Sequence, residues 1–342
     1  MPHPIRTLLL VGLLFAMACG AQRDGGSSTE SAGLRVALLT SGPVSDAGWN
    51  AGAYEGLLRI EHAFGAAISH QQTRTPAEFD EAFLSYASSG YDLIFAHGFE
   101  YQDAAMRAGE QFPNTTIIVS GGGSFAHNVI PLILQLEEGA YLAGMVAAGM
   151  SESGIVGMVG GVAIPPAVGT FRAFEAGARA IDPDINVLEA FIGTWDDVAA
   201  AKEAAVAQLS RGADVLIHNV DAASFGVFQA VREAVAGGRV AWALGMNRDQ
   251  NDVAPDVIIG SAVIRIPEAF HGIVTAWQAG SLGGGPVYAG ASQEVVDFVL
   301  NPELVGLVPA EIVEAVAKAR AMIRAGELDV PTLRVVQGEP GL

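Results

Sequence analysis

From residue 34 onward, short apolar runs alternate with amphipathic stretches, and this alternation restricts the possible folds more than any other feature. Apolar runs of strand length lie at 34–40, 91–97, 115–120, 155–161, 185–193, 213–220, 239–246, 256–266 and 287–289. Helical stretches are predicted at 50–64, from 76, and at 102–112, 137–150, 168–180, 197–210, 225–236, 267–277 and 309–324. Continuous apolar strands between helices are typical of parallel sheets covered on both faces. We therefore expect an α/β protein with two doubly wound lobes.

The N-terminus carries a short apolar segment that has the features of an export signal. Arg6 precedes the eleven residues LLLVGLLFAMA, too few to cross a bilayer of about 30 Å, so residues 1–18 are predicted to be a signal peptide. Cys19, the only cysteine, follows Ala16-Met17-Ala18 and is the predicted lipid attachment point. Residues 19–33 are rich in Gly and Ser, as a lipidated tether would be. The alternative is an ordinary secreted protein with an incidental cysteine.

Charge and motifs exclude several classes of protein. The chain has 37 acidic and 18 basic residues, a net charge of −19, which disfavours binding to nucleic acid. No GxSxG or P-loop motif occurs, and the histidines lack metal-ligand spacing, so we predict neither a metal nor a cofactor. As an enzyme, the protein would need Asp46, Asp103 or Asp221 as its general base. A binding protein explains the sequence better than an enzyme does.

The loops that follow the predicted strands combine aromatic, acidic and amide side chains. In open α/β sheets, ligands bind at the carboxyl ends of the strands, where these loops lie. Aromatic faces stack on flat ligands, and hydroxyl groups donate to carboxylates, so the loops suit a neutral, flat ligand that is polyhydroxylated or heterocyclic. The candidate ligand-binding residues are Asp46, Trp49, Asn50, Phe99, Asp103, Asp221, Phe225, Asn247 and Asp249.

Several segments in order resemble one known family. The opening VALLTSGPVSDAGWNAGAYEGL is followed by GFEYQDAA, EEGAYLAGMVAA, IVGMVGGVAIPPAVGTFRAFEAGARA, GADVLIHNVDAASFGVFQA, ALGMNRDQ and GELDVPTL. Together these segments span about residues 34–332 and resemble the basic membrane protein family, the PnrA-like nucleoside-binding lipoproteins. The resemblance implies a substrate-binding protein of an ABC transporter, held at the cell envelope outside the cytoplasm, that presents a purine or other nucleoside to a permease. It also implies a monomer.

The resemblance implies a fold like that of type I periplasmic binding proteins, in which a hinge of several strands joins the lobes. Lobe 1 is then expected over 34–149 plus 255–285, and lobe 2 over 150–254 plus 286–332. By position in the motifs, Asp46 and Asn50 would hold the base or sugar, and Asp103 would correspond to the family's loop acid. Trp49 would stack on the base, opposite Phe225 or Phe228.

Two positions depart from the family pattern. Asn247 stands where the family has an acid that binds ribose, and Ile264 stands where it has a lysine. A free base, a modified nucleoside or a flavin therefore fits these residues about as well as a nucleoside does. The remaining alternative is a surface sensor that binds such a ligand and signals through a partner without transport.

Overall fold

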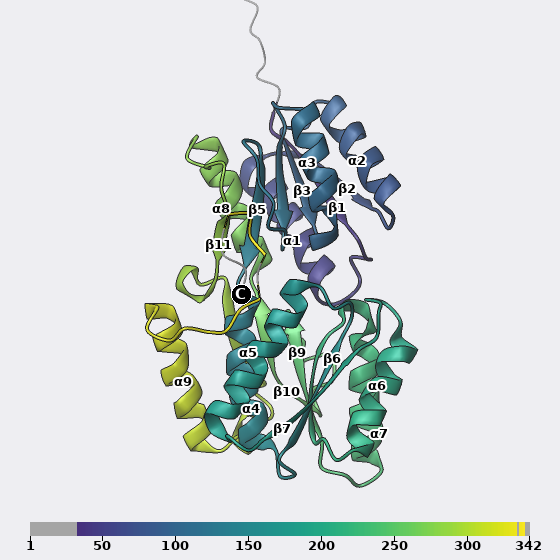
Figure 1. Cartoon of the computed structure of the whole chain (residues 1–342), viewed down its shortest axis with the longest axis vertical. Coiled ribbons are helices and arrows are strands. Elements are labelled where there is room, and N and C mark those ends of the chain that lie inside the picture. The colour runs from purple at the N-terminus through teal and green to yellow at the C-terminus, as the bar shows by residue number, and fades with distance from the viewer. Residues whose placement is uncertain (1–32, 334, 339–342) are drawn as a thin grey trace, which may run out of the picture. The chain divides into compact units, whose positions relative to one another are not determined.

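The structure, a computed structural model, describes residues 33–333 and 335–338 and contains two six-stranded sheets (Figure 1). The predicted signal peptide, Cys19 and nearly all of the predicted tether lie outside the described residues. None of the described helices is both long enough and apolar enough to cross a membrane. The predicted α/β architecture with two doubly wound lobes is confirmed.

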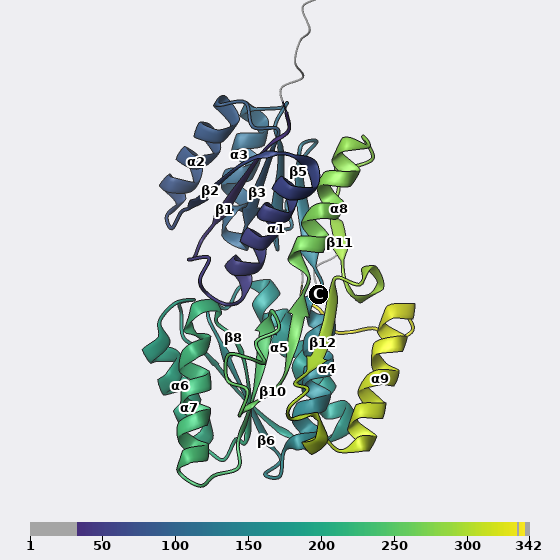
Figure 2. The same cartoon turned by 180° about the vertical axis from the view of Figure 1, so that it is seen from behind.

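The first sheet is entirely parallel and lies in the lobe drawn at the top of Figure 1. Its strands run in the order β11-β5-β4-β3-β1-β2. Their bounds are β1 (Arg35–Thr40), β2 (Ala67–Gln72), β3 (Leu93–His97), β4 (Thr116–Ser120), β5 (Val129–Leu134) and β11 (Val287–Ala289). Helices α1 (Trp49–Phe64) and α8 (Ile266–Gln278) pack together on one face, as Figure 2 shows from behind. Helices α2 (Pro76–Ser88) and α3 (Gln102–Gln111) cover the other.

The second sheet has the order β12-β10-β9-β8-β6-β7, and only its edge strand β12 is antiparallel to its neighbour. Its strands are β6 (Ile155–Gly160), β7 (Asn186–Phe191), β8 (Val215–Asn219), β9 (Trp242–Asn247), β10 (Ile258–Ile264) and β12 (Val296–Leu300). Helices α4 (Leu136–Met150) and α5 (Pro165–Ile181) cover one face, and α6 (Val198–Ser210) and α7 (Ser224–Ala236) cover the other. The last helix, α9 (Ala310–Ala325), packs on α4.

Alternating side chains of the buried strands supply separate cores on the two faces of each sheet. In β1, Val36 and Leu38 belong to the core beneath α1 and α8, whereas Ala37 and Leu39 belong to the core beneath α2 and α3. The core beneath α1 and α8 continues without interruption into the core beneath α4 and α5. One apolar cluster therefore connects the two lobes.

The chain passes between the lobes at three neighbouring places, which form the expected hinge. It crosses at Gln135 after β5, at Arg265 after β10, and between β11 and β12. Backbone hydrogen bonds join these crossings: Gln135 N–H donates to the carbonyl oxygen of Ala289 at 3.0 Å, and Arg265 N–H donates to that of Val295 at 2.7 Å. The three segments therefore bend as one unit.

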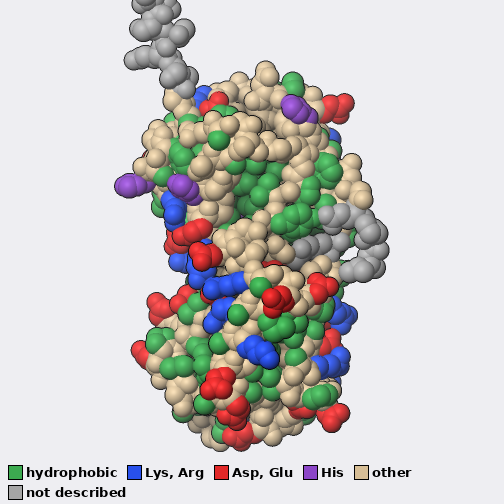
Figure 3. All heavy atoms as spheres, turned by 90° about the vertical axis from the view of Figure 1, so that its left-hand side faces the viewer, with side chains coloured by type: hydrophobic (Ala, Val, Ile, Leu, Met, Phe, Trp, Pro, Cys, Tyr) green, Lys and Arg blue, Asp and Glu red, His purple; other side chains and the backbone are tan. Residues whose placement is uncertain are grey.

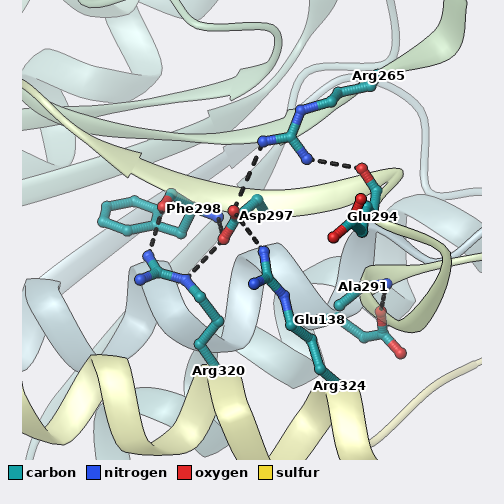
Figure 4. Close-up of polar contacts among 8 residues, drawn as sticks. All are labelled: Glu138, Arg265, Ala291, Glu294, Asp297, Phe298, Arg320 and Arg324. Atoms are coloured by element: carbon teal, nitrogen blue, oxygen red, sulfur yellow. Dashed lines mark hydrogen bonds and ion pairs between the residues drawn. The ribbon is translucent and has the colours of Figure 1, made fainter. Parts of the chain in front are cut away.

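A carboxylate with three arginines fixes the second-lobe side of this hinge (Figure 4). Asp297 on β12 accepts from Arg320 Nε at 2.7 Å and from Arg324 Nη2 at 3.0 Å, and Arg265 Nη2 lies 3.6 Å away. Arg265 also donates to the Glu294 carbonyl oxygen at 2.7 Å. These contacts hold α9 and the Arg265 crossing against the same strand. On this side of the molecule, basic and acidic side chains lie next to one another (Figure 3).

Three strands that the sequence pattern did not reveal complete the sheets. The edge strand β2 reads AISHQQ, which contains no apolar run, and none of its residues is buried. The strand β5 follows the GGG break at 121–123 closely, and β12 is interrupted by Asp297. None of the three was expected as a separate strand.

The segments assigned to each lobe also differ from the expected boundaries. Helix α4 packs on the second sheet rather than the first, and β10 pairs with β9 of the second sheet. Strand β11, expected in lobe 2, pairs with β5 of the first sheet. A hinge strand belongs to the sheet with which it forms hydrogen bonds, and an apolar run alone does not indicate that partner.

Glycines allow α4 and α5 to pack at backbone contact. A Cβ added at Gly144 would overlap the carbonyl oxygen of Phe174 and lie 2.8 Å from the amide nitrogen of Ala178. A Cβ at Gly177 would overlap the carbonyl oxygen of Tyr141 in the same way. Because the obstructing atoms belong to the backbone, neither helix has a side chain that could move aside. The close packing of this pair depends on both glycines.

We expect Gly144→Ala to lower the free energy of unfolding by about 1 to 3 kcal/mol, because the methyl group forces α4 and α5 apart. Urea denaturation of the two proteins measures the difference. The matched control is Gly272→Ala in α8, where an added Cβ has no atom within 4 Å. That variant should be unchanged or more stable by up to about 1 kcal/mol, since alanine is the better helix former. Equal effects at the two positions would contradict this account.

Candidate ligand-binding site

The strand register brings several polar residues to facing edges of the two sheets. In the first sheet, Thr40, His97 and Ser120 pair in one row at the carboxyl ends of β1, β3 and β4. In the second sheet, Gly160 pairs with Asn219 at the ends of β6 and β8. The loops that leave these strand ends meet between the lobes, where open α/β sheets bind ligands.

A cavity of about 660 Å³, a volume that includes solvent at its opening, lies between these edges. Aromatic and apolar side chains form part of its lining: Trp49, Phe99, Leu134, Leu136, Ile164, Pro166, Ala167, Trp195 and Ile264. Polar side chains form most of the rest: Ser41, Glu100, Ser120, Glu137, Thr170, Asn219, Asp221 and Asn247. Among the described residues of this lining there is no Lys or Arg.

Trp49, at the start of α1, is held by a buried histidine. Its indole stacks on the ring of His97 with the centroids 3.9 Å apart, and its carbonyl oxygen accepts a hydrogen bond from His97 Nε2 at 3.1 Å. Burial lowers the pKa of His97 to about 3, so the ring is neutral at physiological pH. His97 therefore supports one side of the indole, while Trp49 lines the cavity.

Asp46 organises the loop in front of α1 and is not part of the cavity lining. Its carboxylate is fully buried and accepts four hydrogen bonds, from the backbone N–H groups of Gly48, Asn50 and Ala51 and from the Asn50 side chain, at 2.8 to 3.0 Å. The negative charge at a helix N-terminus is also favourable. This arrangement is a loop and helix cap, and it leaves the carboxylate no open side toward a ligand.

Asp221, unlike Asp46, lines the cavity and accepts few hydrogen bonds. It follows β8, lines the cavity, and accepts one weak hydrogen bond from Asn247 Nδ2 at 3.4 Å. Burial, together with the negative charges of Asp46 and Glu100, raises the pKa of Asp221 well above its usual value of 3.8. Both Asp221 and Asn247 have positive φ angles, 44° and 72°, which Asp and Asn tolerate better than other non-glycine residues. These two side chains form the polar wall on the second lobe.

Toward solvent, the cavity continues into a wider space that Asn50 and Arg74 line from the first lobe and Thr194 and Asp196 from the second. Asn50 is 1% exposed, and its Oδ1 atom has no hydrogen-bond partner among the described residues. The hydroxyl oxygen of Ser120, in the inner cavity, is likewise without a partner in the described part of the chain. Buried polar atoms of this kind need a partner, and a bound ligand would supply one.

Besides Asp46, three further predicted site residues line neither space. Asp103 is exposed in the first turn of α3, and Asp249 is exposed and accepts a hydrogen bond from Asn251 N–H in a local turn. Phe225 is 41% exposed and lines a separate groove on α7. Its neighbour Phe228 is buried against His218. Neither phenylalanine lines the cavity opposite Trp49.

The aromatic side chain that the second lobe contributes is Trp195, which the sequence interpretation missed. It lies in the loop between β7 and α6 and lines both the inner and the outer space. The rule that loops after strands carry the site applies to this loop as well, so the signal was present in the sequence. Glu137 and Asn219 are further lining residues that were not singled out.

Contacts across the cleft hold the lobes together in this structure. Gln250 Nε2 on the second lobe donates to the carbonyl oxygen of Ala47 on the first at 3.2 Å. Arg248 forms an ion pair with Glu55 of α1 at 2.7 Å. The side chain of Gln250 is itself held, because its Oε1 accepts from His218 Nε2 and from Met246 N–H, both at 2.9 Å. The lobes therefore touch at the loop that precedes Trp49 and at α1.

We expect Asp221→Asn to stabilise the protein at pH 7 by on the order of 1 kcal/mol, because it removes a charge that burial disfavours. The folded protein holds a proton on Asp221 more tightly than the unfolded chain does, so the stability contributed by this group declines as the pH rises above about 3.8. The gain from Asp221→Asn should therefore shrink as the pH is lowered and vanish near pH 4. Urea denaturation across this pH range measures it.

The matched control is Asp46→Asn, for which we expect the opposite sign. An amide cannot accept on both sides as the carboxylate does, so buried N–H groups at the start of α1 would lose their acceptor, at a cost of about 1 to 3 kcal/mol. If both variants were destabilised equally at pH 7, the distinction drawn between the two carboxylates would be wrong.

Comparison with known proteins agrees with this architecture. The family model described as "ABC transporter substrate-binding protein PnrA-like" matches residues 34–333. Basic membrane protein A2 of Borrelia garinii is 27% identical over 94% of this chain and 96% of its own length. A purine-binding protein of Brucella abortus is 26% identical over 89% and 85%, respectively. The expected family resemblance is confirmed.

Solved structures show the same fold. The crystal structure of an ABC transporter solute-binding protein from Aeropyrum pernix superposes with a TM-score of 0.78 at 21% identity, over 87% of this chain and 93% of that one. A solute-binding protein from Conexibacter woesei gives 0.71 at 24% identity, over 88% and 100%. The family consists of solute-binding proteins and not of enzymes. Because the family model covers nearly all of the described residues, the chain belongs to the PnrA-like substrate-binding proteins of ABC transporters.

Proposed function

We propose that the protein binds a nucleoside, most favourably a purine nucleoside, in the cavity between its lobes and presents it to the permease of an ABC importer. The observation that carries this proposal is the pair Trp49 and Trp195, which line one cavity from opposite lobes. Two aromatic faces, one on each lobe, suit a flat heterocycle between them, because stacking on an aromatic side chain favours any base. The relative named as a purine-binding protein supports the same ligand class.

The polar lining supports a ligand with several hydrogen-bond donors. Carboxylate and amide oxygens of Asp221, Asn219 and Asn247 accept from hydroxyl or amino groups. Glu100 adds a further carboxylate at the boundary between the inner and outer spaces. With these acceptors and with no Lys or Arg in the described lining, an anionic ligand such as a nucleotide would be repelled.

Because of two lining residues, a free base or a flavin is the second candidate for the ligand. Asn247 and Ile264, which replace the family's ribose-binding acid and lysine, both line the cavity. An isoleucine offers no hydrogen bond to a sugar hydroxyl group, so fewer groups remain for the ribose. The choice between nucleoside and free base therefore depends on whether Asn247 and its neighbour Asp221 suffice for the sugar.

Anchoring and transport complete the proposal. Substrate-binding proteins of ABC importers act outside the cytoplasm, and the signal peptide 1–18 would direct export. Lipid on Cys19 would then retain the protein at the membrane, with residues 20–33 as the tether. The protein would act as a monomer that closes around its ligand by bending at the hinge.

We expect purine nucleosides to raise the melting temperature of the refolded, ligand-free protein in a thermal-shift screen that includes free bases, flavins and sugars. A ligand present at 100 times its Kd adds about 2.7 kcal/mol of stability. Trp195→Ala should weaken binding by about 1 to 3 kcal/mol, the usual contribution of one stacked base. Titration calorimetry on both proteins measures the loss.

Phe225→Ala is the matched control for this experiment, because Phe225 was predicted to stack on the ligand and lies in a separate groove. The Phe225→Ala variant should bind the nucleoside as tightly as the unaltered protein does. If only free bases or flavins stabilised the protein, those compounds would become the proposed ligands in place of a nucleoside. If Phe225→Ala weakened binding and Trp195→Ala did not, the assignment of Trp195 would be wrong.

We expect the full-length protein, produced in a bacterium that processes lipoproteins, to be recovered in the membrane fraction and to incorporate labelled fatty acid. Cys19→Ser should abolish the label, because serine has no thiol to which the lipid could be attached. The comparison uses immunoblots of fractionated cells. Equal incorporation of the label into Cys19→Ser would refute Cys19 as the lipid attachment point.

A further inference from the structure

The triple glycine at 121–123 receives a segment from the far end of the chain. Residues 335–338, here called the C-terminal segment, lie against the loop that follows β4. Gln337 N–H donates to the carbonyl oxygen of Gly123 at 2.9 Å, and the Gln337 side-chain oxygen accepts from Phe125 N–H at 3.2 Å. Two hydrogen bonds in opposite directions therefore attach the C-terminal segment to the first lobe.

The packing at Gly123 is too close for any other residue. A Cβ there would overlap the carbonyl oxygen of Val335 and lie 2.7 Å from its carbonyl carbon and 3.1 Å from the Cα atom of Val336. All three are backbone atoms, so the C-terminal segment would have to leave its place. The φ angle of Gly123 is not positive, so the need for glycine comes from this contact and not from backbone conformation.

The same part of the chain is attached to the second lobe. It leaves α9, which packs on α4, and Leu333 passes close to Gly169 of α5, where an added Cβ would lie 3.0 Å from the Leu333 amide nitrogen. The yellow trace in Figure 1 follows this course from α9 toward β5. The chain thus links the lobes at a fourth place, apart from the three crossings of the hinge.

The C-terminal segment also lines the cavity system. Val335 and Val336 line a space of about 340 Å³, together with Phe99, Gly121, Glu137 and Pro166. Those four residues line the main cavity as well, so the two spaces adjoin. Val336 is 4% exposed. The family model matches residues 34–333, so the C-terminal segment lies outside the matched residues.

We propose that the C-terminal segment is a wall of the ligand cavity that ties the first lobe to the second and slows the exit of the ligand. The inference about ligand exit rests on the proposed function. To open the cleft, the protein must either break the hydrogen bonds at Gly123 and Phe125 or move Leu333 away from Gly169 of α5. Within the C-terminal segment, Val336 closes the space and Gln337 holds the segment in place.

The test is Gly123→Ala, which leaves the C-terminal segment in the chain but removes the room for it. Gly306→Ala is the matched control, since an added Cβ there has no atom within 4 Å. Gln337→Ala is a second variant that removes one hydrogen bond without adding bulk. Thermal unfolding verifies that each variant is folded, and if Gly123→Ala is not, Gln337→Ala carries the test.

The first readout needs no ligand. Acrylamide quenching of Trp49 and Trp195 fluorescence, in a background with Trp242→Phe and Trp277→Phe, reports how open the cavity is. We expect stronger quenching in Gly123→Ala and Gln337→Ala than in the unaltered background, and no change in Gly306→Ala. Unchanged quenching in both variants would overturn the proposal that the C-terminal segment closes the cavity.

The second readout is the dissociation rate of guanosine, measured by stopped-flow fluorescence. We expect it to rise roughly tenfold in Gly123→Ala, with a smaller change in the association rate. An unchanged dissociation rate would overturn the role in ligand exit. If guanosine does not bind the unaltered protein, nucleoside binding is refuted, and the quenching experiment still decides whether the C-terminal segment closes the cavity.

Discussion

Parallel strand pairing is the constraint on which this molecule depends. Parallel neighbours cannot be joined by a tight turn, so each connection must return over a face of the sheet, and every strand then ends at the same edge. In the first sheet this edge is marked by the row Thr40, His97 and Ser120. The hinge places the equivalent edge of the second sheet opposite. The cavity is therefore a consequence of the topology, and the loops decide its chemistry.

In these loops, the number of hydrogen bonds that a carboxylate accepts distinguishes an acid that supports the loop from an acid that lines the cavity. Asp46 accepts four and has no capacity left, so its charge is used to hold the loop and the start of α1. Asp221 accepts one long hydrogen bond and faces the cavity, and burial raises its pKa. A group that is unfavourable for folding and lies in a cleft is a candidate for function. The two acids cannot be distinguished by sequence, since each simply follows a strand.

The sequence predicted the architecture because strands buried on both faces are apolar throughout, and most of the strands here are of that kind. It missed β2, none of whose residues is buried, and it also missed β5, although all six residues of that strand are buried. It could not assign β10 and β11 to a lobe, since that assignment depends on hydrogen-bonding partners. Strand ends located Trp49, Phe99, Asp221 and Asn247 at the cavity. The sequence could not predict which way a side chain points within a loop or helix. Phe225 and Trp195 both follow strands, yet Phe225 lines a groove on α7 and Trp195 lines the cavity.

The continuous apolar cluster between the lobes limits how this protein can change shape. Because the core beneath α1 and α8 runs into the core beneath α4 and α5, a wide separation of the lobes on the hinge side would expose buried apolar surface. The hinge segments are in addition joined by backbone hydrogen bonds and by the Asp297 cluster. The lobes therefore move at the lowest cost in free energy by a small rotation about the hinge, which opens the cleft on the side away from the hinge. There, the contacts of Gln250 with Ala47 and of Arg248 with Glu55 are few and polar, and the partly exposed ion pair breaks at little cost.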